Sequence, residues 1–341
     1  ADDQVLIKQV IAYYHQTLKE SAEGLAYLKS RGITSPDVIQ RYQIGFANRT
    51  LGLRVPPRSQ SGGAEIRNRL NRIGILRKTG HDRYNGSIVI PVFDEAGDVR
   101  EIYGRKITVG LREGTPDHMY LPEHANRGVF NVEALARYPE IILCEALIDA
   151  LTFLNAGFPN VTTAYGVNGF TAEHRAAFER YKTKRVLIAY DRDEAGEKAA
   201  ASLACELMAS GIECFRVQFP HGMDANEYAL KVIPAAKSLG LVIRKAVWMG
   251  KGTGPVREEA GPLVEVLPAP PLEPAVTTSV TPTSPPVAVA ASRLPAPPVP
   301  SPVLERAAAV PARPASAPVA PPIPDAPVVA RAATPTTPPA A

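Results

Sequence analysis

Cysteine and long apolar runs are scarce in this sequence, and each scarcity excludes a class of protein. The 341 residues contain three cysteines, Cys144, Cys205 and Cys214, with no Cys-x-x-Cys spacing, so neither a zinc ribbon nor a disulfide framework is expected. No apolar run approaches the roughly 20 residues that a transmembrane helix needs, and acidic residues interrupt the N-terminus. We therefore expect a reduced, cytoplasmic setting without a membrane partner, in which Cys144 is a buried free thiol.

Glycine is absent after Gly261, and proline takes its place. Residues 262–341 hold 23 of the 34 prolines, separated mainly by Ala, Val, Thr and Ser. Such a tract cannot bury enough apolar surface to offset the entropy of ordering it. We therefore expect a disordered Pro/Ala-rich tail, and functional inference rests on residues 1 to about 250.

Positive charge is concentrated in one segment. The formal net charge is +4, but residues 41–83, which we name the basic block, contain ten Lys or Arg and two acids. A basic block of this kind is typical of surfaces that bind phosphate backbones. Taken alone, the basic block is better interpreted as a solvated face or a flexible loop.

Short apolar segments that each lead into carboxylates are the main feature that is present. Residues 141–144 lead into Glu145, residues 185–190 into Asp191 and Asp193, and residues 212–217 through a turn into Asp224. Apolar runs of this length, bounded by turn residues, predict buried strands. Helical patterns lie between them, at 146–156, 171–182 and 195–210.

Alternating strands and helices predict an α/β fold with a doubly wound, mainly parallel sheet. Ligands of such sheets bind beyond the carboxyl ends of the strands, where Glu145, Asp191, Asp193 and Asp224 would gather. Asp149 lies one helical turn after Glu145. Because gathered carboxylates repel each other, a hard cation such as Mg²⁺ or Mn²⁺ is expected between them.

Each carboxylate also has a structural interpretation. Asp193 is placed to cap a helix, Glu145 lies near a helix start where the dipole favours it, and Asp149 could lie on the surface. The joint pattern, with each group at a strand end, favours a metal site over separate caps.

The remaining segments before residue 140 predict a smaller α+β region. A hairpin is expected from 87–93 and 99–107, with Gly97 at a positive φ in its turn. Ser35 and Pro36 are typical of an N-cap and first helical position, and Gly32 of a helix end. Helices are expected at 3–20, 23–30, 35–42, 64–73, 131–138 (capped by Asn131) and within 230–248.

The acidic pattern resembles the Toprim domain of primases and topoisomerases. It reads Glu145-x-x-x-Asp149, then Asp191-x-Asp193-x-Ala-Gly, then Asp224. Residues 27–47, the hairpin at 86–105 and residues 119–131 resemble, in the same order, the catalytic core of bacterial DnaG-type primases. The resemblance covers about residues 10 to 232.

The resemblance implies a metal-dependent nucleotidyltransferase that makes short RNA primers on single-stranded DNA from ribonucleoside triphosphates, in plasmid or mobile-element replication for instance. A helicase or other replication protein would be a partner, and the basic block would follow the DNA. The implied site residues are Glu145, Asp191 and Asp193 as catalytic groups (Glu145 as ligand or general base), Glu145, Asp149, Asp191, Asp193 and Asp224 as metal ligands, and Arg105 and Arg127 on triphosphate or template.

The resemblance also implies a division of the chain and shows departures from the family. The basic N-terminal α+β subdomain is expected at 1–137, the Toprim domain at 138–232, a short helical extension at 233–261 and the tail at 262–341. The zinc-binding and helicase-binding modules of the family are not found in these residues. Ala146, Asn226 and His118 stand where the family usually has Gly, often has Asp and tends to have Lys.

Two other functions stay open at this stage. A Toprim nuclease or topoisomerase-like enzyme would use the same carboxylates to cleave DNA, although none of the twelve tyrosines stands out as a nucleophile. A non-catalytic accessory protein that binds single-stranded DNA would fit Asn226 and the proline-rich tail. A Gly-x-x-x-x-Gly-Lys-Ser/Thr phosphate loop is absent, so a nucleotide-hydrolysing helicase is not expected.

Overall fold

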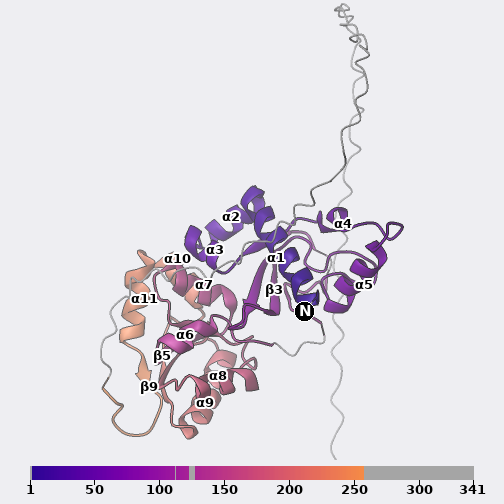
Figure 1. Cartoon of the computed structure of the whole chain (residues 1–341). Helices are drawn as coiled ribbons and strands as arrows, with labels where there is room; N and C mark the ends of the chain where they lie inside the picture. Colours follow the sequence, from indigo (N-terminus) through magenta and orange to yellow (C-terminus); the bar gives the residue numbers. More distant parts are fainter. Residues whose placement is uncertain (1, 112, 123–126, 257–341) are drawn as a thin grey trace, which may run out of the picture. The chain divides into compact units, whose positions relative to one another are not determined.

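The structure, a computed structural model, describes residues 2–111, 113–122 and 127–256 (Figure 1). The disorder expected for the tail at 262–341 and the last residues of the expected helical extension lie outside this range.

The first part of the chain is built on a four-stranded antiparallel sheet in the order β1-β2-β3-β4. Its strands are β1 (Gly45–Ala47), β2 (Ser87–Phe93), β3 (Val99–Lys106) and β4 (His118–Met119). The predicted hairpin of β2 and β3 is confirmed, and Gly97 has a φ of 75° in its turn. The sequence did not predict β1 and β4, because two or three residues are too few to show a period.

Five helices accompany this sheet: α1 (Asp2–Glu20), α2 (Ala22–Ser30), α3 (Pro36–Arg41), α4 (Leu51–Arg54) and α5 (Gly63–Ile73). The expected start of α3 is confirmed, since the Ser35 hydroxyl accepts a hydrogen bond from the Val38 N–H (3.3 Å) and Pro36 is the first helical residue. Gly32, with a φ of 69°, follows α2 as expected.

The second part is built on a five-stranded sheet in the order β6-β5-β7-β8-β9. Its strands are β5 (Glu140–Cys144), β6 (Val161–Thr163), β7 (Arg185–Ala189), β8 (Glu213–Arg216) and β9 (Val247–Trp248). The first four in the sheet are parallel and β9 is antiparallel to β8, which confirms the mainly parallel sheet. Residues 247–248, expected within a helix, form β9 instead.

Helices cover both faces of this sheet (Figure 1). They are α6 (Val132–Arg137), α7 (Leu147–Asn155), α8 (Ala172–Arg180), α9 (Glu194–Ala209), α10 (Ala225–Lys231) and α11 (Ala235–Arg244). Ile142 and Leu187 pack with α7, α10 and α11, whereas Ile141 and Val186 pack with α6, α8 and α9. The strands are therefore apolar on both faces, as parallel strands usually are.

One apolar core joins the two sheets. Leu28 of α2, Ile90 of β2 and Leu151 of α7 belong to a single buried cluster. Close to this cluster, the backbone N–H groups of Thr34 and Ser35 each donate to Oδ1 of Asn155 (both 2.8 Å). The elements before residue 45 thus help to bury the second sheet's helices.

Asn131 corrects one sequence prediction. It precedes α6, but its side chain makes no capping hydrogen bond, and its φ is 54°. Its Nδ2 instead donates to the carbonyl oxygens of Pro159 (3.0 Å) and Val161 (2.8 Å). The predicted cap is wrong because two buried carbonyl groups near β6 need a donor.

Burial of the cysteines agrees with the sequence analysis. Cys144 and Cys214 are buried, Cys205 is exposed, and all three are free thiols. Among the described residues, no helix is both long and apolar enough to cross a membrane.

Gly45 provides a first prediction, because α1 lies directly on β1. A Cβ at Gly45 would lie 2.6 Å from Cβ and 2.7 Å from the carbonyl carbon of Tyr14. Gly45→Ala should therefore lower the free energy of unfolding by about 1–3 kcal/mol in urea titrations. Gly52→Ala is the control: nothing lies within 4 Å of a Cβ there, and the change should be neutral or stabilising by up to about 1 kcal/mol. Equal losses for both variants would contradict the prediction.

Glu101 of β3 provides a second prediction, on pH. Its carboxylate is buried, accepts hydrogen bonds from the N–H groups of Ile102 (2.9 Å) and Leu121 (2.7 Å), and has its pKa raised to about 7, mainly by burial. The unfolded pKa is about 4.3, so the folded state binds more protons between these values and stability falls as pH rises from about 4.3 to 7. The slope contributed by this group is at most about 1.4 kcal/mol per pH unit.

The measurement is urea unfolding between pH 5 and pH 8 of the wild type and Glu101→Gln. The glutamine keeps an acceptor for both backbone N–H groups and removes the titration, so its stability should depend less on pH. Parallel pH profiles for the two proteins would show that Glu101 does not titrate in this window.

Candidate active site at the acidic edge

The structure places all five predicted carboxylates around one end of the five-stranded sheet. Each follows a strand or lies in the first turn or cap of a helix. They are Glu145 after β5, Asp149 in α7, Asp191 after β7, Asp193 before α9 and Asp224 before α10. We name these five residues the acidic edge.

Two members of the acidic edge are helix caps as well. Oδ1 of Asp193 accepts a hydrogen bond from the N–H of Gly196 (2.7 Å), and Oδ1 of Asp224 accepts one from the N–H of Glu227 (2.6 Å). The capping interpretation of Asp193 is thus confirmed. Because a cap uses one carboxylate oxygen, it does not prevent the other from binding a cation.

Gly196 allows the turn between β7 and α9 to be tight. A Cβ at this position would lie 2.3 Å from the carbonyl oxygen of Asp191 and 3.2 Å from Oδ1 of Asp193. The glycine after the two aspartates is therefore explained by steric restriction. A side chain at position 196 would displace the backbone of Asp191 and the carboxylate of Asp193.

Burial and mutual repulsion raise the pKa values of three carboxyl groups of the acidic edge. Burial, then the charge of Asp191, raises the pKa of Glu145 to about 7. Burial, then the charges of Asp224 and Asp193, raises the pKa of Asp191 to about 6. The pKa of Asp149 is raised by burial and then by Asp224. The acidic edge therefore carries more negative charge than its own surroundings balance.

The donor chemistry of the acidic edge fits a hard cation. Among the described residues, no three His, Cys, Asp or Glu side chains stand close enough to enclose a metal ion by themselves. Mg²⁺ seldom needs such an enclosure, because it keeps several waters and uses one or two carboxylates together with substrate phosphates. The thiol of Cys144 at the end of β5 is fully buried with its pKa raised, so it offers no soft ligand.

Asn226 serves as a structural link. Its Oδ1 accepts from Arg31 (3.2 Å), and its Nδ2 donates to the Arg31 carbonyl (2.7 Å) and to Oγ1 of Thr152 (2.8 Å). Its backbone N–H donates to Oδ1 of Asp149 (3.2 Å). The amide is 1% exposed, so Asn226 connects α2, α7 and α10.

Arg105 and His118 lie side by side on β3 and β4. Nη1 of Arg105 contacts Nε2 of His118, and Nδ1 of His118 lies 2.8 Å from the Tyr103 hydroxyl. Burial and then the charge of Arg105 lower the pKa of His118, which keeps its imidazole neutral. Arg105, whose Nε has no hydrogen-bond partner among the described residues, is thus the cation of this group.

Arg127 lies near the buried carboxylate of Glu101 in β3. Its side chain is exposed, and its charge offsets part of the rise that burial causes in the pKa of Glu101. The Tyr165 hydroxyl donates to its carbonyl oxygen (3.1 Å). The predicted role of Arg127 on triphosphate or template stays a prediction.

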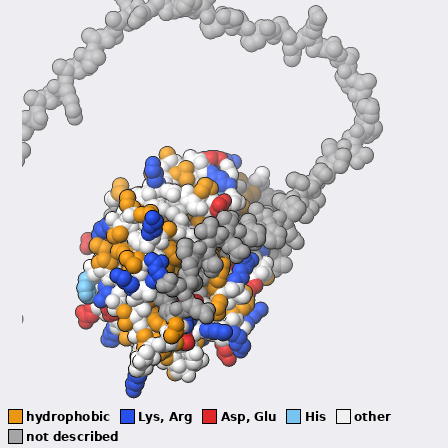
Figure 2. Space-filling view, turned by 90° about the vertical axis from the view of Figure 1, so that its left-hand side faces the viewer, with side chains coloured by type: hydrophobic (Ala, Val, Ile, Leu, Met, Phe, Trp, Pro, Cys, Tyr) orange, Lys and Arg blue, Asp and Glu red, His pale blue; other side chains and the backbone are white. Residues whose placement is uncertain are grey.

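The basic block divides into structural and clustered arginines. Arg67 donates to three backbone carbonyls, including those of Pro56 (2.7 Å) and Val55 (2.7 Å), and Arg69 pairs with Asp3 (2.7 Å). By contrast, Arg49 and Arg77 lie close enough to Lys106 of β3 for their charges to lower its pKa after burial does. In the face drawn in Figure 2, Lys and Arg side chains are spread among apolar and acidic ones.

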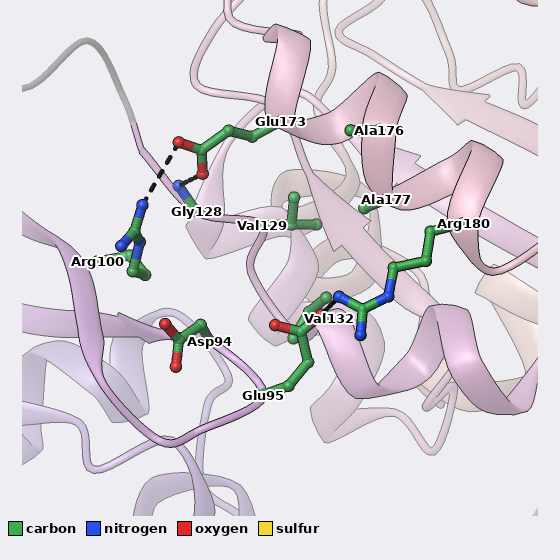
Figure 3. A pocket seen from close by; sticks show the side chains of 10 residues that line it. All are labelled: Asp94, Glu95, Arg100, Gly128, Val129, Val132, Glu173, Ala176, Ala177 and Arg180. Carbon is green, nitrogen blue, oxygen red and sulfur yellow. Dashed lines mark hydrogen bonds and ion pairs between the residues drawn. The ribbon is translucent and has the colours of Figure 1, made fainter.

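A cavity of about 250 Å³ lies between the hairpin and α8, away from the acidic edge (Figure 3). Four of its five charged side chains are paired across it, Arg180 with Glu95 (3.0 Å) and Arg100 with Glu173 (3.7 Å). No residue of the acidic edge lines it. These ion pairs connect the hairpin to α8. The acidic edge therefore remains the better candidate for an active site.

Sequence reasoning missed a group of charged residues beside the acidic edge. Arg216 of β8 is 4% exposed, and its guanidinium donates to Glu197 of α9 (3.0 Å). Arg192, between the two aspartates, also pairs with Glu197 (2.9 Å). The signal that could have found them is an arginine inside the apolar run 212–217.

Comparisons with known proteins agree with this geometry. A family model described as the N-terminal domain of the DNA primase catalytic core matches residues 13–123, and a Toprim-like model matches residues 142–229. The DNA primases of Aquifex aeolicus and Campylobacter jejuni are each 27% identical to the chain, over 233 and 236 residues. These alignments cover 66% of this chain but 45% and 38% of the relatives, so the chain spans less than half their length.

Solved structures give the same picture. A DnaG catalytic core is similar with a TM-score of 0.61 at 25% identity, covering 72% of this chain and 81% of that one. The zinc-binding and RNA polymerase domains of Aquifex aeolicus primase give 0.60 at 25% identity, covering 72% and 60%. A DnaG primase catalytic domain bound to single-stranded DNA gives 0.59 at 25% identity, covering 72% and 82%. The chain is thus similar to the catalytic core of DnaG-type primases, with a match to the N-terminal domain of that core at residues 13–123 and to a Toprim-like domain at residues 142–229.

Proposed function

We propose that this chain is a metal-dependent nucleotidyltransferase that joins ribonucleotides into short primers on single-stranded DNA. The observation that carries the proposal is the acidic edge: five carboxylates gather at one end of a Toprim-like sheet beside a DnaG-type N-terminal domain. The relatives are named DNA primases, and one similar structure is bound to single-stranded DNA. This chain's activity, substrates and partners are inferred from both.

The acidic edge would hold Mg²⁺ or Mn²⁺. The backbone nitrogen of Asp191 donates to Oε2 of Glu145 (3.4 Å). Because these two residues are neighbours, their carboxylates are the first candidates to share an ion. Asp193 and Asp224 each keep one carboxylate oxygen outside their cap bond, and Asp149 completes the negative surface. A bound ion would lower the pKa of the attacking 3′-hydroxyl and offset the negative charge that develops on pyrophosphate.

Cations on and beside the four-stranded sheet would bind the substrates. Arg105, beside neutral His118, would contact the triphosphate. Arg49, Arg77 and Lys106 repel one another in the absence of a polyanion, which favours them as contacts to the DNA backbone. Arg67 and Arg69 are excluded from this set, because Arg67 donates to three backbone carbonyls and the charge of Arg69 is paired with Asp3. Lys106 donates to the neutral carbonyl oxygen of Asn85, which leaves its charge uncompensated by that contact.

The match of residues 13–123 to the primase N-terminal domain favours primer synthesis over DNA cleavage by a Toprim nuclease or topoisomerase. The proposal does not extend to a helicase partner, which stays an expectation from the family resemblance.

Asp191→Asn tests the catalytic assignment. Asp191 is not a helix cap, so the substitution removes one negative charge without removing a cap. The melting temperature of the metal-free variant should equal or slightly exceed that of the metal-free wild type, because carboxylate repulsion is relieved. Magnesium-dependent stabilisation should vanish, and ribonucleotide incorporation on single-stranded DNA should fall about 100-fold or more.

The control is Glu194→Gln, which removes an exposed carboxylate in the same turn. It should leave incorporation within about twofold of the wild type. A wild type that binds the template but incorporates nothing would support an accessory role, and cleavage of the template would support the nuclease.

The clustered cations give a prediction on salt dependence. Arg49, Arg77 and Lys106 changed together to Gln should weaken binding of an oligonucleotide such as dT20 and lower the slope of log K against log salt by about 2 units, because three phosphate contacts are lost. Fluorescence anisotropy at several salt concentrations measures both.

The matched control changes three other cations, Arg137, Lys182 and Lys184, to Gln. They precede β5 and β7, at the end of the sheet opposite the acidic edge. The slope of this variant should equal that of the wild type. Equal slopes for both triple variants would leave the cluster without a role in DNA binding.

A further inference from the structure

Two arginines and one glutamate connect the two turns that carry Asp191, Asp193 and Asp224. Oε1 of Glu197 pairs with Nε of Arg192 (2.9 Å) and with Nη2 of Arg216 (3.0 Å). The side chains of Arg192 and Arg216 are 19% and 5% exposed. We name Arg192, Glu197 and Arg216 the arginine bridge.

Arg216 holds the backbone that presents Asp191. Its guanidinium donates five hydrogen bonds, four of them to backbone carbonyls at the ends of β7 and β8. The four acceptors are the oxygens of Ile188 (3.1 Å), Tyr190 (2.9 Å), Val217 (2.9 Å) and Asp191 (2.9 Å). A lysine could not reproduce this set, because its single ammonium group has three donors and no planar fork.

Arg192 ties the same turn to the segment before Asp224. Its Nη1 donates to the carbonyl oxygen of Phe219 (3.1 Å). Its backbone N–H donates to Met223 (3.3 Å), and its carbonyl accepts from the N–H of Gly222 (3.0 Å). Arg192 is thus fastened through its side chain and its backbone to residues 219–223, the segment that leads into Asp224.

We infer that the arginine bridge is a positioning device, which fixes the separation between Asp191 and Asp224 before any cation binds. The inference rests on the proposed function, because it assumes that the acidic edge holds the cation. The two carboxylates repel each other, so without a connection their turns would relax apart. With the bridge in place the ligands are preorganised, so the free energy of cation binding is not reduced by the cost of bringing the two turns together.

If the arginine bridge acted only through its charges, substitutions in it would change cation affinity differently than if it positions the ligands. This difference provides the test. Arg192→Gln removes a positive charge near the acidic edge, so simple Coulomb attraction predicts tighter cation binding. Glu197→Gln removes a negative charge and should weaken it by the same reasoning. If the bridge positions the ligands, both substitutions weaken binding, by about 10-fold each, as is usual for groups that orient metal ligands.

The experiment is calorimetric titration of the full chain with Mn²⁺ alone, accompanied by metal-free thermal melts. The controls are Arg175→Gln and Glu206→Gln, since Arg175 of α8 and Glu206 of α9 form a pair away from the acidic edge (3.0 Å). Glu206 and Glu197 have similar side-chain exposure, 42% and 44%. The control variants should bind Mn²⁺ as the wild type does.

The double variant Arg192→Gln/Glu197→Gln supplies a second readout. Because both residues act through one bridge, its loss of Mn²⁺ affinity should be smaller than the product of the two single losses. In incorporation assays, the bridge variants should need about 10-fold more Mg²⁺ while reaching near-normal rates at saturation.

Tighter or unchanged Mn²⁺ binding by Arg192→Gln overturns the inference and leaves the proposed function intact. If neither the wild type nor Asp191→Asn binds Mn²⁺, the proposed cation site fails, and this inference fails with it. Equal weakening in the bridge and control variants would show that the loss of any ion pair on α9 disturbs the fold, which also contradicts positioning.

Discussion

Carboxylates of like charge have to be kept near one another, and the second half of this fold is arranged around that constraint. The parallel sheet brings the ends of β5 and β7 to one edge. Three helices, α7, α9 and α10, begin there and direct the partial positive charge of their N-termini toward it. The caps made by Asp193 and Asp224 use the same carboxylates for helix formation. Helix formation and the proposed cation site therefore share the carboxylates of Asp193 and Asp224, through different oxygens of each.

The sequence predicted the elements whose residues show a period or a cap. The hairpin of β2 and β3, the helices from α1 to α3 and the parallel strands β5, β7 and β8 were found close to their bounds. The five carboxylates were singled out because they lie in the strand-to-helix connections of the predicted sheet or in the first helical turn after one. Strands β1, β4, β6 and β9 were missed, since two or three residues show no alternation and exist only through their partners.

The side-chain partners could not be predicted, because they are decided by segments far apart in the sequence. Arg67 of α5 has the charge expected of a DNA contact, but it donates to three backbone carbonyls in α4 and in the residues that follow α4. Asn226 has the position of a ligand, but its amide is engaged by Arg31 and Thr152, which lie 195 and 74 residues away. Arg216 lies within the apolar run that predicted β8, and the sequence gives no sign of its partners. The strand ends that it links meet only in the folded chain.

The shared core has a consequence for how the chain is made. Asn155, which accepts hydrogen bonds from Thr34 and Ser35, leaves the ribosome 121 residues after Thr34. Until then the apolar faces of Leu28 and Val38 lack their partners in α7. Folding of this part is therefore delayed by vectorial synthesis, and the nascent chain carries an unpaired apolar surface while the residues between α3 and α7 are translated.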